Sequence, residues 1–413
     1  MNPDRTACKK LDAEDPLAQC RARFELPVGT IYLDGNSLGP LPKHVPDKIS
    51  GLIRDEWGRD LISSWNLHDW IRLPQTVGEK IAPLIGAAPG QVIAADSTSI
   101  NVFKLLSAAL VAQQGRRVIL STRDNFPTDL YMAEGLSELL GRERCELRLV
   151  AAGEIVASLN QETALLLLTQ VDFRSGRLLD MGTLTQAAHK VGAMVLWDLA
   201  HSAGAVPLAL DAQGVDLAVG CGYKYLNGGP GAPAFLYVAQ RHQAQLQQPL
   251  AGWMGHRAAF DFNPNYEPAT GMARFLCGTP PVLAMRALDA ALDLWVGIDM
   301  NVLRRKSVAL TELFIRLVED SLILRECVLA SPRDPALRGS QVSFSHPQAY
   351  SIMQALIDAA VIGDFREPDL MRFGFTPLYT RYVDVWDAVS CLEGIVKEER
   401  FKAPAYQQRK SVT

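Results

Sequence analysis

A lysine stands just past the end of an apolar run near the middle of the chain. Lys224 follows the run DLAVGCG (216–222) and is preceded by Tyr223. The apolar run before it, GAMVLWD (192–198), ends in Asp198. An ionised aspartate is costly to bury at such a position unless a cation lies beside it. The two runs therefore suggest a carboxylate and an amine that meet in one site.

One cofactor uses a lysine and an aspartate together in this way. Pyridoxal phosphate forms a Schiff base with a lysine amine, and a carboxylate keeps its pyridine nitrogen protonated. The lysine must be partly desolvated so that its amine can be neutral, which a strand end beside Tyr223 could provide. We therefore expect pyridoxal 5'-phosphate between Asp198 and Lys224.

The same cofactor needs groups for its phosphate and for the face of its ring. Thr98 and Ser99 precede the amphipathic segment 100–114, and a helix N-terminus is suited to bind a phosphate. Phe126 could stack on the ring, with Asp129 close behind it. Each residue also has a structural interpretation, because Ser, Thr and Asp are common helix caps and Phe is a common core residue.

The elements around these residues predict an α/β fold. Runs that are apolar on both faces alternate with amphipathic helices, which is typical of strands buried in a mostly parallel central sheet flanked by helices. Ligands collect at the carboxyl ends of such strands, where Thr169 and Asp198 are found. The predicted strands are 116–122, 145–151, 163–170, 192–198, 216–222 and 232–238.

The texture of the chain changes after about residue 290, where long helical patterns precede a strand–helix–strand–helix series. We therefore expect a large cofactor-binding α/β domain over residues 51–300 and a smaller α+β domain over 301–413. The N-terminal segment 1–50 is expected to pack with the small domain.

Composition excludes several classes of protein. The 413 residues carry a formal charge of −4, which gives no basic patch for nucleic acid. No apolar stretch is long enough to span a membrane, and the polar N-terminus lacks the apolar centre of a signal peptide, so a cytoplasmic location is expected. The 7 cysteines are scattered without a CxxC pair, and neither a disulfide framework nor a metal site is expected.

Several motifs in combination resemble those of the fold-type I pyridoxal-phosphate enzymes, related to class V aminotransferases, and within them the kynureninases. The resemblance runs nearly end to end. It implies hydrolysis of the Cβ–Cγ bond of L-kynurenine to anthranilate and L-alanine in tryptophan degradation, by a homodimer with shared active sites. The motifs are YLDGNSLG (32–39), SWN (64–66), STSIN (97–101), NFPTDLY (125–131), WDLAHSAGA (197–205), GYKYLNGGPG (222–231), GWMGH (252–256), FLCGTPP (275–281) and MRFGFTPLY (371–379).

The resemblance implies roles for individual residues. Lys224 would be the Schiff-base lysine, Asp198 and Asp129 would face the pyridine nitrogen, and Tyr223 would also transfer protons. The remaining contacts to the cofactor and its phosphate would come from Thr98, Ser99, Phe126, Thr169, His201, Tyr223, Trp253 and Thr279, some of them in the second subunit.

Substrate recognition is implied in the same way. Arg372 would bind the α-carboxylate through its planar guanidinium. Trp65, Gly278 and Thr279 match the bacterial kind of kynureninase, which favours L-kynurenine over its 3-hydroxy form. Asp172 departs from the family, since many relatives have asparagine there, and we assign it no role.

Other functions are compatible with parts of the sequence. A cysteine desulfurase or a class V aminotransferase would share the fold, but desulfurases usually place histidine directly before the lysine and carry a cysteine on a mobile loop. A dehydrogenase is disfavoured because no strand leads into GxGxxG. A non-catalytic sensor that binds the aldehyde would be distinguished by cofactor absorbance without turnover.

Overall fold

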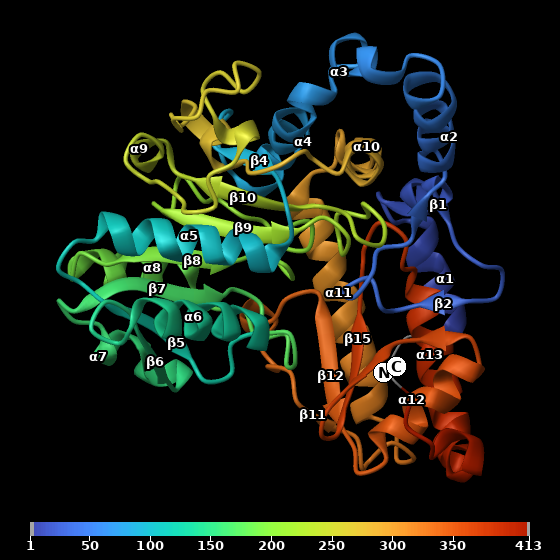
Figure 1. Cartoon of the computed structure of the whole chain (residues 1–413). Helices are drawn as coiled ribbons and strands as arrows, with labels where there is room; N and C mark the ends of the chain where they lie inside the picture. The colour runs from blue at the N-terminus through green and yellow to red at the C-terminus, as the bar shows by residue number, and fades with distance from the viewer. Residues whose placement is uncertain (1–3, 411–413) are drawn as a thin grey trace.

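The computed structural model describes residues 4–410, so the tips of the predicted segments 1–50 and 301–413 (residues 1–3 and 411–413) lie outside the described residues. Its centre is a seven-stranded sheet in the order β4-β10-β9-β8-β7-β5-β6 (Figure 1). Within this sheet β10 runs antiparallel to both its neighbours, and the other pairs are parallel. The strands are β4 (Val92–Ala94), β5 (Val118–Thr122), β6 (Glu146–Val150), β7 (Thr163–Thr169), β8 (Met194–Asp198), β9 (Leu217–Cys221) and β10 (Ala234–Val238).

The six predicted strands and the mostly parallel sheet are confirmed. The sequence reading missed β4, because its three residues are too short a run to stand out. Alternate residues of one strand enter different cores: Leu165 and Leu167 of β7 pack on one face, and Leu166 and Leu168 pack on the other. This two-sided burial explains why the strands appear as continuous apolar runs.

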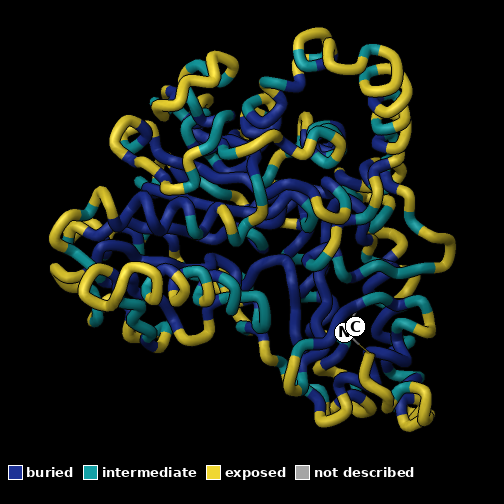
Figure 2. The backbone as a smooth tube through the Cα atoms, viewed as in Figure 1, coloured by how far each residue is buried: buried dark blue, intermediate teal, exposed yellow. Residues whose placement is uncertain are grey.

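Helices cover both faces of this sheet (Figure 1). One face packs against α5 (Thr98–Ala112) and α6 (Pro127–Leu140). The opposite face packs against α4 (Leu73–Ile81), α7 (Ile155–Ser158), α8 (Met181–Lys190) and α10 (Val282–Ala291). The short α9 (Gln240–Gln243) follows β10. Figure 2 shows the strands as the most continuously buried part of the chain.

A second sheet, in the order β11-β12-β15-β14, lies in the C-terminal part of the chain. One face of it packs against the long α11 (Met300–Glu319), α12 (Ala349–Asp358) and α13 (Tyr382–Lys397), around a core of its own. Its strands are β11 (Val328–Leu329), β12 (Gln341–Ser345), β14 (Asp364–Arg366) and β15 (Leu370–Gly374). The strand–helix–strand–helix series expected after residue 340 is therefore confirmed.

The N-terminal segment contacts this smaller unit. Helix α1 (Arg5–Ala13) packs against α13, and β2 (Ile31–Tyr32) pairs in parallel with β13 (Val361–Ile362) (Figure 1). Phe24, however, belongs to the core of the large sheet, so the segment bridges both units. The three predicted domain boundaries stay predictions.

Between this segment and α4 the chain forms an arch that carries α2 (Val45–Gly51) and α3 (Ser64–Leu67) (Figure 1). The short strands β1 (Phe24–Glu25) and β3 (Leu41–Pro42) pair antiparallel at its base. Large apolar side chains of the arch, including Ile62 and Leu67, are exposed. No helix in residues 4–410 has the length and apolar character to cross a membrane.

Candidate active site

Strand register places the predicted reactive residues at one edge of the large sheet. Thr169, the last residue of β7, is registered with Asp198, the last residue of β8. Asp198 is in turn registered with Val219 of β9, and Lys224 follows shortly after β9 ends. The carboxyl ends of these parallel strands therefore bring the hydroxyl, the carboxylate and the amine together.

A pocket of about 420 Å³ opens at this edge, within the range of roughly 300–1,000 Å³ that is typical of ligand pockets. It gathers nine of the predicted cofactor-binding residues: Thr98, Ser99, Phe126, Asp129, Thr169, Asp198, His201, Tyr223 and Lys224. Asp96, Ser97, Thr128, Phe173, Ala200, Gly231, Ala232 and Ala234 also line it.

Two buried carboxyl groups face each other at the base of the pocket. Burial raises the pKa of both Asp129 and Asp198, and the negative charge of Asp198 raises the pKa of Asp129 further. The Lys224 ammonium and the backbone N–H of Ala200, 2.7 Å from Oδ1, favour the ionised form of Asp198. The pair therefore shares one proton, held on Asp129, with the negative charge on Asp198.

The Lys224 amine lies among aromatic rings. Its Nζ is 5.9 Å from the centre of the Phe126 ring and 5.8 Å from that of Tyr223. Among the described residues, no hydrogen bond or ion pair holds this amine, whose charge still acts on Asp198 and Asp129. The amine is thus free to bond to a ligand in the pocket.

The N-terminus of α5 forms another wall. The Ser97 side chain accepts a hydrogen bond from the backbone N–H of Ile100, and Thr98 and Ser99 line the pocket in the first turn. Asp96 precedes them with a left-handed backbone (φ 47°) and forms an ion pair with the fully buried Lys104. Hydroxyls and free backbone amides of this turn are suited to bind an anion.

Asn125 holds two walls of the pocket together, and the sequence reading gave it no role. Its side-chain oxygen accepts hydrogen bonds from the backbone N–H groups of Phe126 and Thr169 and from the Thr169 hydroxyl. Its amide donates to Ser121. The available signal was its place shortly after the end of β5, inside the motif 125–131.

Phe173 was also missed. Its ring lines the pocket and meets that of Phe126 edge to face, with ring centres 5.2 Å apart. It belongs to the loop after β7, whose turn is built by Asp172: the carboxylate accepts from the backbone N–H and the hydroxyl of Ser175. Asp172 therefore has a structural role in the turn.

Arg372, the predicted binder of the substrate carboxylate, lies beside the pocket and does not line it. It is 1% exposed in the centre of β15. Nε donates to Asp364 at 2.8 Å, Nη2 donates to Asp364 and to Ser37, and Nη1 donates to the backbone carbonyl of Phe173 at 2.6 Å. Burial acts to raise the pKa of Asp364, but Arg372 outweighs it and holds that pKa below its usual value.

The remaining predicted residues do not reach the pocket within one chain. Trp65 lies in α3 of the arch against Trp70, with ring centres 6.0 Å apart. Trp253 packs on Phe260 and Phe262, both exposed. Gly278 and Thr279 are exposed, and no atom lies within 4 Å of a Cβ built on Gly278.

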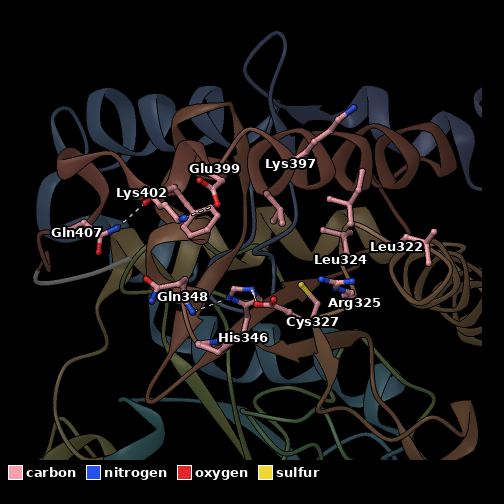
Figure 3. Close-up of a pocket in the computed structure, with 15 residues that line it drawn as sticks. Leu322, Leu324, Arg325, Cys327, His346, Gln348, Lys397, Glu399, Lys402 and Gln407 are labelled. Carbon is pink, nitrogen blue, oxygen red and sulfur yellow. Dashed lines mark hydrogen bonds and ion pairs between the residues drawn. The ribbon is translucent and has the colours of Figure 1, made fainter.

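A larger hollow of about 910 Å³ lies in the C-terminal unit, between the end of α11 and the end of α13 (Figure 3). Lys402 forms an ion pair with Glu399 in its wall, and His346 lies 3.6 Å from Glu326. No strand end of the large sheet reaches it. The smaller pocket is therefore the candidate active site.

The residues of that pocket fit pyridoxal phosphate. The amine of Lys224 can bond to its aldehyde, Asp198 supplies a carboxylate for its ring nitrogen, and the start of α5 supplies donors for its phosphate. Phe126 supplies an aromatic face. The structure brings these groups, which the sequence predicted to lie close together, into one partly enclosed space.

Comparison with known proteins agrees with this geometry. Residues 303–392 match the family model of the kynureninase C-terminal domain. The chain is 52% identical over 408 residues to a kynureninase of Burkholderia pseudomallei, covering 98% of each chain. It is 50% identical over 414 residues to a kynureninase of Pseudomonas fluorescens, covering 99% of each.

Solved structures share the fold at lower identity. A cysteine desulfurase from Thermococcus onnurineus matches with a TM-score of 0.77 at 19% identity, over 92% of this chain and 98% of that one. A variant of the lyase C-DES, with glycine covalently linked to its pyridoxal-phosphate cofactor, matches with a TM-score of 0.75 at 18% identity, over 95% of this chain and 99% of that one. These likenesses show the fold-type I architecture. By its full-length relatives, the chain belongs to the kynureninase family.

Proposed function

We propose that the pocket formed by the ends of β7, β8 and β9 and the start of α5 hydrolyses L-kynurenine to anthranilate and L-alanine, with pyridoxal 5'-phosphate as cofactor. As a kynureninase the chain is a hydrolase that acts on a carbon–carbon bond. The observation that supports this site most strongly is the meeting of a free Lys224 amine with the Asp198–Asp129 pair in one pocket.

Different residues of the pocket would bind different parts of the cofactor. Lys224 would hold it covalently, Asp198 would face its ring nitrogen, and Phe126 would lie against the ring. Thr98 and Ser99 would bind the phosphate through the first turn of α5. When bound, pyridoxal phosphate supplies an electron sink for the bonds broken next to it.

The reaction also needs protons moved at defined atoms. One water enters for each kynurenine cleaved, so the chain must take a proton from Cα, admit water to the γ-carbonyl carbon, deliver a proton to Cβ and finally return one to Cα. We assign the first task to the Lys224 amine. Burial raises the pKa of Tyr223, so its phenol stays protonated and can donate a proton to Cβ when the Cβ–Cγ bond breaks.

Substrate orientation falls to Arg372 in this proposal. Its Nη1 already points to the pocket wall, where it donates to the carbonyl of Phe173. The Asp364 carboxylate takes Nε and one side of Nη2, so Nη1 is the nitrogen left for a substrate carboxylate. Binding would exchange the Phe173 carbonyl for that carboxylate.

We further propose that a second copy of the chain completes the site. Trp253, Gly278 and Thr279 lie outside the pocket of their own chain, and exposed aromatic side chains at Phe260 and Phe262 flank Trp253. Such an exposed apolar group supports an interface. A homodimer with shared sites, a cytoplasmic location and lower activity on 3-hydroxykynurenine remain predictions.

The test is product analysis on purified protein loaded with pyridoxal phosphate. Kynurenine should give fluorescent anthranilate and alanine in equal amounts, and L-cysteine should give no sulfide. The Lys224→Ala variant should lose at least roughly a thousandfold in rate. Sulfide release from cysteine without anthranilate from kynurenine would favour the desulfurase chemistry of the structural neighbours and reject the proposal.

A further inference from the structure

Gln341 links the small sheet to the active-site pocket, although it contacts no ligand-binding space itself. It is the first residue of β12 and is fully buried. Its side-chain oxygen lies 2.7 Å from Nδ1 of His201, which lines the pocket. Its side-chain nitrogen donates to the backbone carbonyls of Asp172 and Phe173, each at 3.1 Å.

The chemistry of these partners fixes which way the amide points. A carbonyl oxygen can only accept, so the amide NH₂ of Gln341 must face Asp172 and Phe173. The amide oxygen is then left facing His201, and an oxygen with no hydrogen can only accept. The His201 Nδ1 opposite it must therefore carry a proton.

One ring nitrogen of a histidine sets the state of the other. Burial, with the nearby charge of Lys224, lowers the pKa of His201 well below its usual value, so the ring is neutral. A neutral ring with its proton on Nδ1 has a bare Nε2. Within residues 4–410 no protein group is hydrogen-bonded to Nε2, which leaves it to the pocket.

We infer that Gln341 is a positioning residue: it locks His201 in the Nδ1–H form, so that Nε2 presents a hydrogen-bond acceptor to the pocket. Any atom of a bound molecule that meets Nε2 must then be a donor. The inference deepens the proposed function and rests on it only for the identity of that molecule. The tautomer itself is a property of the protein without ligand.

Further hydrogen bonds join the loop held by Gln341, residues 172–175, to the small sheet and the segment before β12. Ser343 of β12 donates to the carbonyl of Arg174, and Ser331 donates to that of Ser175. Arg372 of β15 donates to the carbonyl of Phe173. The small sheet therefore holds the loop that carries Phe173 against the pocket, while Gln341 alone among these groups also contacts His201.

The test is nitrogen NMR on protein labelled with ¹⁵N-histidine and free of cofactor. The shifts of the two ring nitrogens and their couplings to the ring carbon-bound protons identify the tautomer, and a His201→Asn sample assigns the signal. The unmodified protein should show protonated Nδ1 and bare Nε2 at His201. An Nε2–H form in that sample would overturn the inference without any variant having to fold.

The same spectrum contains an internal reference. His346, also buried, accepts a hydrogen bond at Nδ1 from the backbone N–H of Gln348, so its proton must sit on Nε2 (Figure 3). His201 and His346 should therefore show opposite patterns. Identical patterns would contradict the structural assignment.

Gln341→Met keeps the length of the side chain and removes its hydrogen bonds. It should shift the tautomer ratio of His201 toward Nε2–H by about tenfold or more. Ser343→Ala loosens the same loop without touching His201 and should leave the ratio unchanged. Gln243→Met is a matched control, because Gln243 is a buried glutamine that also donates to two backbone carbonyls but, within the described residues, makes no hydrogen bond to a histidine.

Activity gives an independent second reading. With cofactor and kynurenine, Gln341→Met should lower kcat/KM by about tenfold, and more than Ser343→Ala does. A tautomer that stays Nδ1–H in a folded Gln341→Met protein would overturn the inference. An unmodified protein with the Nδ1–H form but no anthranilate production would instead reject the proposed function and leave the inference intact.

Discussion

Among single residues, the buried carboxyl pair Asp129 and Asp198 has the clearest effect on how stability depends on pH. The pKa of Asp129 is raised well above its usual value, so the folded chain holds a proton that the unfolded chain has released above about pH 4. The contribution of Asp129 to stability is therefore fully present below that pH and is lost as the pH rises toward its folded pKa. In the proposed function, the charge on Asp198 would serve the cofactor, which explains why the site keeps this unfavourable pair.

Replacing Asp129 with Asn should remove part of this pH dependence. The variant, free of cofactor, should become more thermally stable relative to the unmodified protein as the pH rises from 5 toward 8. The comparison is made at intervals of roughly one pH unit. The difference between the melting temperatures of the two proteins is measured across that range. Carboxyl groups other than Asp129 contribute equally to both proteins, so their effect cancels in this difference. Parallel curves would show that Asp129 carries no extra proton.

The buried ion pair of Arg372 and Asp364 leads to a second prediction at this scale. Asp364→Asn leaves a buried guanidinium without its carboxylate, which should cost about 3–5 kcal/mol of folding free energy.

Arg372→Lys keeps the charge but loses the planar fork, and it should raise KM for kynurenine about tenfold with a smaller effect on kcat. Steady-state kinetics and denaturant unfolding check the two effects separately. A change in kcat alone would contradict a binding role for Arg372.

At the scale of elements, the start of α5 depends on a buried lysine. Lys104 is fully buried, pairs with Asp96 and donates to the carbonyl of Phe275 at 2.7 Å. It thereby fixes the turn that precedes Thr98. The proposed phosphate site would therefore depend on Lys104, further along the helix, as well as on the helix end.

Lys104→Met should therefore weaken the affinity for pyridoxal phosphate by about tenfold and lower stability by about 3 kcal/mol. Lys80→Met is the control, since Lys80 pairs with Asp289 and Asp293 but is partly exposed and lies away from the pocket. Cofactor titration followed by absorbance compares the two. Equal losses in both variants would show that the effect on Lys104 is general destabilisation.

The sequence carried enough information for the strands and the pocket residues that follow them. Thr169, Asp198 and Lys224 could be predicted to lie together because parallel strands place their carboxyl ends at one edge. Phe173 could not, because its position depends on how the small sheet holds the loop after β7, through contacts between residues far apart in the chain. The same holds for Asn125, whose partners lie on a neighbouring strand.

At the scale of the whole molecule, the prediction of shared sites accounts for the residues that one chain leaves outside its pocket. Trp253 and Thr279 have no place near Lys224 in the chain itself. Mixing two inactive variants tests whether a partner supplies them. Lys224→Ala and Thr279→Ala, refolded or exchanged together, should regain up to roughly a quarter of the unmodified activity if each site draws on both chains.

Recovery requires that the two defects fall in one site of a mixed dimer and leave the other site intact. Lys224→Ala mixed with Asp198→Asn is the control, because both residues line the pocket of one chain and each site of the mixed dimer then keeps one defect. Recovery in the control alone, or in neither mixture, would contradict sharing by Thr279.

In the proposed site, Lys224 and Asp198 hold one pyridoxal phosphate between them. Borohydride reduction of the loaded protein, followed by peptide mass spectrometry, tests it most directly. The cofactor mass should appear on the peptide containing Lys224, and Asp198→Asn should weaken the loading without moving the site of attachment. Attachment at another lysine, or none at all in a protein that still releases anthranilate, would contradict it.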